Sequence, residues 1–183
     1  FITVALLLDQ PNPFPDTWIY VHSPDVLMGR VQNYLNWSPH MVAAEGQCCI
    51  AAEYFAWQGD ELWEMSDADL IELGRKELGQ VGLIEPGAML DATVVRIAHG
   101  YPIYDADYAD HINTIRAWLE GLENFQTIGR NGQHRYINMD FAVMTGVEAA
   151  RNVFGADLNT WRIGTEDEYL EKLGRVAVNK VSN

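Results

Sequence analysis

Residues 128–140 read Ile-Gly-Arg-Asn-Gly-Gln-His-Arg-Tyr-Ile-Asn-Met-Asp, and a helical pattern follows directly. The two glycines of this stretch allow the backbone to approach another group closely, and its two arginines stand in an otherwise strongly acidic chain. The helix that we expect to begin near Met139 or Asp140 directs its unpaired N–H groups and its positive dipole end back at this loop. Such a terminus suits an anion or an electron-rich ring edge, so the stretch predicts half of a cofactor site.

The chain is strongly acidic, with a formal net charge of −14 over 183 residues. Binding of nucleic acid needs a basic surface, and so does binding of an anionic membrane, so the charge argues against both partners. The longest apolar run, residues 2–8, is far shorter than the roughly 20 residues of a membrane span. It also lacks the basic flank of a signal peptide. We therefore expect a cytoplasmic protein without a membrane span.

The cysteines and histidines predict no metal site. Cys48 and Cys49 are adjacent, which suits neither a disulfide framework nor a metal motif. We expect both to be reduced thiols in a buried strand. The histidines at positions 40, 99 and 134 lack the ligand spacing of a zinc site.

The N-terminal two thirds of the chain predict an α+β fold. Short apolar or alternating runs bounded by turn residues predict strands over 2–8, 18–22, 29–37, 48–57 and 92–98. Ser66 with a carboxylate three residues later predicts the start of a helix over 66–81. A second helix is expected after Asp105 or Asp107. Strands this close together indicate a mixed or antiparallel sheet with flanking helices.

The C-terminal third predicts a strand, a loop and a helix. Residues 125–128 are expected to form a short strand, the arginine–glycine loop follows, and a helix covers 140–154. We divide the chain into a substrate-binding-like domain (1–120), this strand–loop–helix segment (121–155) and a polar tail (156–183) with a short helix near 166–173. Because Phe1 already lies in a strand and no Gly-x-Gly-x-x-Gly fingerprint is present, we expect the chain to be the C-terminal part of a longer protein.

The stretch at 128–140 closely resembles the C-terminal flavin-contacting motif of UDP-galactopyranose mutases and related flavoproteins of the amine oxidase superfamily. Their pattern is Gly-Arg-x-Gly-x-x-x-Tyr-x-x-Met followed by a helix, which returns the chain to a Rossmann FAD domain. The resemblance implies FAD in the full-length parent, not retained by this chain alone. It also implies that the missing N-terminal dinucleotide-binding domain is the partner. The implied FAD contacts are Gly129, Arg130, Gly132, Met139 and Asp140.

The same resemblance implies a substrate side. Tyr136 matches the mutase tyrosine that reaches the substrate diphosphate, and Tyr101 before Pro102 resembles a second such tyrosine. Arg30 resembles the first residue of the mutase Arg-Ile-x-Glu strand. Trp37 before Ser-Pro could form one wall of a cleft, the alternative being a strand end and a proline turn. Asn138 departs from the aspartate of the mutases.

The arginines allow two interpretations. Arginine forms bidentate pairs with phosphate, but it also pairs with carboxylates, which are abundant here. We favour a ligand role for Arg130 and leave both interpretations open for Arg30 and Arg96.

Three functions remain open. Residues 60–98 are longer than the mutase segment and look more like the substrate domains of protoporphyrinogen oxidases and amine oxidases. We therefore favour a fragment of an FAD-dependent oxidoreductase that acts on a small molecule. The alternative is a mutase-like flavin isomerase of a nucleotide sugar. A hypothesis of another class is a non-catalytic ligand-binding or docking domain, and the isolated chain is expected to be inactive. No catalytic residue is assigned.

Overall fold

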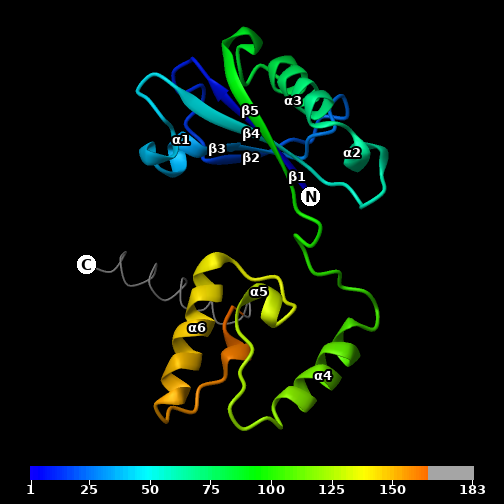
Figure 1. The fold of residues 1–183 in the computed structure, drawn as a ribbon, viewed down its shortest axis with the longest axis vertical. Coiled ribbons are helices and arrows are strands. Elements are labelled where there is room, and N and C mark those ends of the chain that lie inside the picture. The colour runs from blue at the N-terminus through cyan, green and yellow to red at the C-terminus, as the bar shows by residue number, and fades with distance from the viewer. Residues whose placement is uncertain (165–183) are drawn as a thin grey trace, which may run out of the picture. The chain divides into compact units, whose positions relative to one another are not determined.

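The computed structural model describes residues 1–164. The chain divides into two compact units, Phe1–Gly100 and Tyr101–Asn183 (Figure 1). The short helix predicted near 166–173 lies outside the described residues. In the part that is described, no helix is long and apolar enough to cross a membrane.

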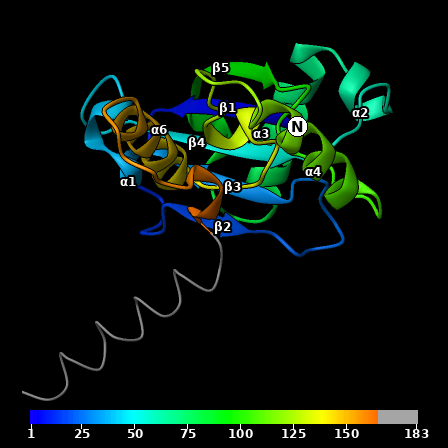
Figure 2. The same cartoon turned by 90° about the horizontal axis from the view of Figure 1, so that it is seen from below.

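The first unit is built on a five-stranded antiparallel sheet, so the predicted α+β class is confirmed. The strand order is β2-β3-β4-β1-β5, and Figure 2 shows it from β5 at the top to β2 at the bottom. The strands are β1 (Ile2–Leu8), β2 (Trp18–Tyr20), β3 (Arg30–Asn33), β4 (Cys48–Tyr54) and β5 (Met89–Arg96). The shorter elements of this unit are α1 (Tyr34–Trp37), η1 (Pro39–Met41), α2 (Glu61–Glu64) and η2 (Pro86–Ala88).

One face of the sheet forms the core. Along β1 every second side chain is fully buried, because successive residues of a strand point to opposite faces. The register aligns Val4 with Ala52, and Ala52 with Val31, on this face. Helix α3 (Asp67–Gln80) packs on it, against β1, β4 and β5. A Cβ at Gly74 would lie 3.0 Å from Val4, so the glycine allows the helix to approach the sheet closely.

A buried carboxylate fastens α3 to the sheet. Glu77 accepts hydrogen bonds from the backbone N–H groups of Leu27 and Met28, at 2.7 and 3.1 Å, and from the Tyr54 hydroxyl at 3.0 Å. Burial, followed by the charge of Glu77, raises the pKa of Tyr54 far above its ordinary value. The tyrosine therefore stays protonated and keeps its hydrogen bond.

The second unit is helical in its described part. It contains α4 (Tyr108–Leu119), α5 (Gly129–Gly132), α6 (Met139–Val153) and η3 (Thr160–Arg162). Its small interior lies where α6 meets α5 and η3. Gln133 is fully buried there and donates to the Thr127 carbonyl and the Thr160 hydroxyl, both at 3.3 Å. Helix α4 has no buried residue.

Two predicted strand segments are wrong. Residues 34–37, expected to continue β3, form α1, because Asn36 donates to the carbonyls of Phe14 and Asp16 (both 2.8 Å) and competes with strand pairing. Residues 125–128 are irregular, and Gln126 donates instead to the Ala149 carbonyl at 3.0 Å. The predicted loop at 129–132 is the short helix α5.

Candidate functional site

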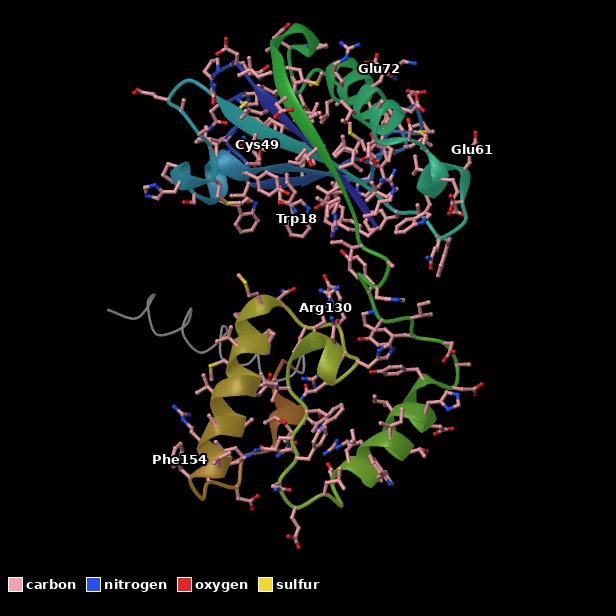
Figure 3. The ribbon with its side chains drawn as sticks, viewed as in Figure 1. Trp18, Cys49, Glu61, Glu72, Arg130 and Phe154 are labelled. Carbon is pink, nitrogen blue, oxygen red and sulfur yellow. The ribbon has the colours of Figure 1, made fainter. Side chains whose placement is uncertain are left out.

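Arg130, which is labelled in Figure 3, lies close to two tyrosines of the second unit. Its guanidinium carbon is 4.8 Å from the ring centre of Tyr101 and 4.4 Å from that of Tyr136. The two rings are stacked with centres 5.7 Å apart, and both tyrosines are more than a third exposed. We refer to these three residues as the arginine–tyrosine cluster. Each of them is predicted from the sequence as a site residue. Together they place a guanidinium beside two rings that a ligand can reach.

Two further tyrosines support this cluster. The Tyr104 hydroxyl accepts from the Tyr136 backbone N–H at 2.5 Å, and the Tyr108 hydroxyl donates to the His134 carbonyl at 2.8 Å. The Tyr104 and Tyr108 rings meet edge to face, with centres 4.6 Å apart. Burial raises the pKa of Tyr108, so its hydroxyl stays a donor. Neither residue is predicted as a site residue from the sequence, although tyrosines at 101, 104 and 108 follow a helix-like spacing that could have signalled them.

The backbone N–H of Gly129, which is predicted to face a cofactor, instead donates a hydrogen bond within the protein. Gly129 has a φ of 72°, which favours glycine. Its N–H donates to the Thr145 hydroxyl at 2.8 Å, and Thr145 donates to the Ala142 carbonyl at 2.7 Å. A ligand beside Gly129 therefore meets its Cα and not its N–H. Around Gly132, a Cβ would meet nothing within 4 Å, so this position also lies open.

The N-terminus of α6 is accessible. Met139, its first residue, is 83% exposed, and Asp140 is exposed as well. The side chain of Asn138, at the N-cap position, makes no capping hydrogen bond. The predicted helix start at Met139 is confirmed, and the N–H groups and positive dipole end of this 15-residue helix are presented at the surface.

Arg30 belongs to a separate group on the sheet face opposite α3. Its Nε lies 2.6 Å from a Glu53 carboxylate oxygen, and the two residues are 9% and 5% exposed. The pair follows from the register, which places Arg30 directly opposite Glu53. The rings of Phe1, Trp18 and Phe55 have their centres 5.0–5.7 Å from the guanidinium carbon.

Trp37 is joined to this pair through one glutamine. Gln32 donates to Glu53 at 3.1 Å and accepts from the Trp37 indole N–H at 2.9 Å. We refer to Arg30, Gln32, Glu53 and Trp37 as the Arg30 network. Trp37 is 55% exposed, so its ring is available to a ligand. The two substrate-side residues predicted in this unit are thus brought together.

Two other arginines bind the protein's own backbone. Arg96 donates to the carbonyls of Trp63 and Met65, at 3.2 and 2.6 Å, and pairs with Asp67 at 2.5 Å. Arg135 donates to the carbonyls of Trp161 and Ile163, and burial lowers its pKa. Both therefore connect structural elements.

The cavities lie elsewhere. One of about 400 Å³ in the second unit lies among Arg116, Asp157 and Trp161. Another, of about 480 Å³, lies in the first unit between η1 and residues 42–47. Neither is lined by Arg130, Arg30 or Trp37. Among the residues that the structure describes, no group of three or more His, Cys, Asp or Glu side chains could hold a metal ion.

The fold is shared with a known class of protein, the UDP-galactopyranose mutases. The crystal structure of a reduced UDP-galactopyranose mutase superposes with a TM-score of 0.73 at 21% identity, over 87% of this chain and 34% of that chain. A proposed protoporphyrinogen oxidase from Exiguobacterium gives a TM-score of 0.47 at 21% identity, over 63% of this chain and 26% of that one. No protein-family model and no curated protein matches. The chain thus has a fold found in UDP-galactopyranose mutase and spans about a third of the length of that structure.

Proposed function

We propose that the chain is the substrate-binding and flavin-contacting part of an FAD-dependent oxidoreductase. The observation that carries this proposal is the position of Arg130 against Tyr101 and Tyr136, in a segment that leads into the accessible N-terminus of α6 at Met139. This arrangement lies in a chain that shares its fold with a UDP-galactopyranose mutase. A guanidinium beside two stacked rings and an accessible helix N-terminus are both features that fit an electron-rich ring system with an anionic tail.

FAD would be held by the segment from 129 to 140. When bound, it would supply the redox chemistry, while this chain would supply binding and orientation. Arg130 would lie along the ring system, and the first turn of α6 would direct its N–H groups toward it. The open backbone at Gly129 and Gly132 would allow close approach. The contacts proposed are those of Gly129, Arg130, Gly132, Met139 and Asp140.

Substrate-side residues are proposed within each unit by itself. They are Arg30 and Trp37 in the first unit, and Tyr101 and Tyr136 in the second. Each of the three aromatic residues is more than a third exposed. Their rings provide rigid contact area at little cost in conformational entropy.

A dinucleotide-binding domain of the same protein would cover the second unit. Helix α6 exposes Met139, Val143 and Val147 at a spacing of four residues, which is one face of a helix. Ile115 and Trp118 of α4 are also more than half exposed. Apolar surface of this extent marks an interaction site.

The runner-up is a mutase-like isomerase acting on a nucleotide sugar. It is favoured by the fold likeness to a UDP-galactopyranose mutase and by the two tyrosines beside Arg130, since hydroxyl groups and a guanidinium suit a diphosphate. Turnover of the parent protein separates the two. An oxidoreductase consumes an electron acceptor in proportion to substrate, whereas an isomerase needs only a priming reduction.

The flavin proposal is tested on the parent protein, expressed from the complete coding region that contains this chain. We expect it to purify with bound flavin, detected by its visible absorbance, and Arg130→Leu to lower the retained FAD about tenfold, which is about 1.4 kcal/mol of binding free energy. Arg116→Leu is the matched control, because Arg116 also lies 5.1 Å from an aromatic ring, that of Trp161. A parent without flavin, or equal loss in both variants, would contradict the proposal.

A further inference from the structure

The sheet face opposite α3 carries a row of exposed rings. Trp18, Tyr20 and His22 are alternate residues and follow one another with ring centres 5.1 and 6.0 Å apart. Trp18 is 40% exposed and Tyr20 is 59% exposed. Figure 3 labels Trp18 on this unit. Since Trp18 lies opposite Gln32 and Tyr20 opposite Arg30 in the register, the row borders the Arg30 network.

The charge beneath these rings is balanced. The Nε of Arg30 lies 2.6 Å from a carboxylate oxygen of Glu53, and both residues are buried. The positive charge is therefore matched by a negative charge at the same depth. A charge already paired at contact distance gives little further attraction to an anion.

The polar groups between the rings are also engaged with one another. Gln32 uses its amide N–H₂ on Glu53 and its oxygen on the Trp37 indole. The surface therefore presents mostly ring faces and edges, supported by a rigid and electrically neutral base. Such a surface recognises a flat molecule by stacking and by apolar contact.

We propose that this face, the rings of Trp18, Tyr20 and Trp37 above the Arg30–Glu53 pair, selects an uncharged, ring-bearing substrate. The inference rests on the proposed function, because it names the substrate class of the same enzyme. A diphosphate would find no net cationic charge in this pair, so this face is not suited to bind one.

The test measures ligand binding by the chain itself, without flavin, so that its failure and the failure of the flavin proposal remain distinguishable. The probes are 2-naphthol and 2-naphthoate, which share a ring system but differ in charge near neutral pH. Binding is followed by NMR at the Trp37 indole N–H, whose signal is identified by its loss in Trp37→Phe. We expect 2-naphthol to shift this signal and to bind about tenfold more tightly than 2-naphthoate.

One variant tests the role of the charge balance between Arg30 and Glu53. Glu53→Gln removes one negative charge from this face and keeps the size of the side chain, so the preference should reverse toward 2-naphthoate. Trp18→Ala should weaken 2-naphthol binding, whereas Trp118→Phe in α4 is the matched control and should leave it unchanged. If Glu53→Gln does not fold, the two probes on the unaltered chain still decide. Equal or tighter binding of 2-naphthoate there, or no shift of the Trp37 signal with 2-naphthol, would overturn the proposal.

Discussion

The two units differ in how much of their apolar surface they bury. In the first unit fourteen apolar side chains are buried, from β1, β3, β4, α3 and the loops between them. In the described part of the second unit only Ile137, Ala149 and Ile163 reach that level. The sheet unit thus provides its own hydrophobic stabilisation, whereas the helical unit keeps its apolar side chains at the surface. The first unit therefore has a substantial hydrophobic core of its own, whereas the core in the described part of the second unit is small.

The largest expected effect tests the difference in burial between the two units. Leu6 is fully buried in β1, whereas Val143 on α6 is 60% exposed. Leu6→Ala should lower the free energy of unfolding by about 2–5 kcal/mol, because it removes buried methyl groups and leaves a cavity. Val143→Ala should change it by less than about 0.5 kcal/mol. Urea denaturation followed by circular dichroism measures both, and equal effects would mean that the second unit is packed like the first.

A second, smaller effect depends on pH and belongs to the sheet unit. Burial raises the pKa of the Cys48 thiol from 9.0 to about 11. The folded state therefore holds this proton when the unfolded state has lost it. The resulting stabilisation is complete below pH 9 and is lost as the pH rises through 11. It amounts to at most about 2–3 kcal/mol.

Cys48→Ala should remove this contribution to the pH dependence. Urea titrations between pH 8 and 11.5 should give a shallower decline for the variant than for the unaltered chain, whatever its stability at neutral pH. Cys49→Ala is the natural comparison, because burial also raises the pKa of Cys49 but this side chain is only partly buried. An identical slope in the unaltered chain and in Cys48→Ala would contradict the assignment.

The smallest effect sharpens the description of the second unit. Thr145 is fully buried and accepts from the Gly129 N–H at 2.8 Å. Thr145→Val keeps the shape but leaves that N–H without its acceptor, at a cost of about 1–2 kcal/mol. Amide hydrogen exchange at Gly129 should accelerate, while amides of β1 should not change. Unchanged exchange at Gly129 would show that the loop does not depend on this hydrogen bond.

The elements that could be predicted are those with local causes. The strand at 2–8 follows from an uninterrupted apolar run, and the helix from 67 follows from Ser66, whose hydroxyl accepts from the Asp69 N–H at 3.2 Å. Residues 34–37 could not be predicted, because the hydrogen bonds of Asn36 to residues some twenty positions earlier decide their conformation. Residues 125–128 read as a strand by composition alone, and no strand of the described residues pairs with them.

The sequence predicts those residues of the candidate site that belong to a motif. It does not predict contacts that depend on residues brought together by the fold. Arg130, Tyr101 and Tyr136 were nominated from sequence and lie together. Arg96 is equivalent to Arg30 in the sequence, yet it donates to two backbone carbonyls as well as pairing with Asp67. The pairing of Arg30 with Glu53 depends on the strand register, which a list of residues does not contain.

The two adjacent thiols of β4 have a practical consequence. Because successive side chains of a strand point to opposite faces, Cys48 faces the core, whereas Cys49, labelled in Figure 3, lies on the face of the Arg30 network. The two thiols are adjacent in the same strand, but they differ in how easily a reagent reaches them, because Cys48 is buried and Cys49 is only partly buried. The rate of alkylation at Cys49 therefore reports access to the aromatic face, while that at Cys48 reports opening of the core. The ratio of the two alkylation rates, measured in one reaction, therefore compares access to the aromatic face with opening of the core in the same molecule.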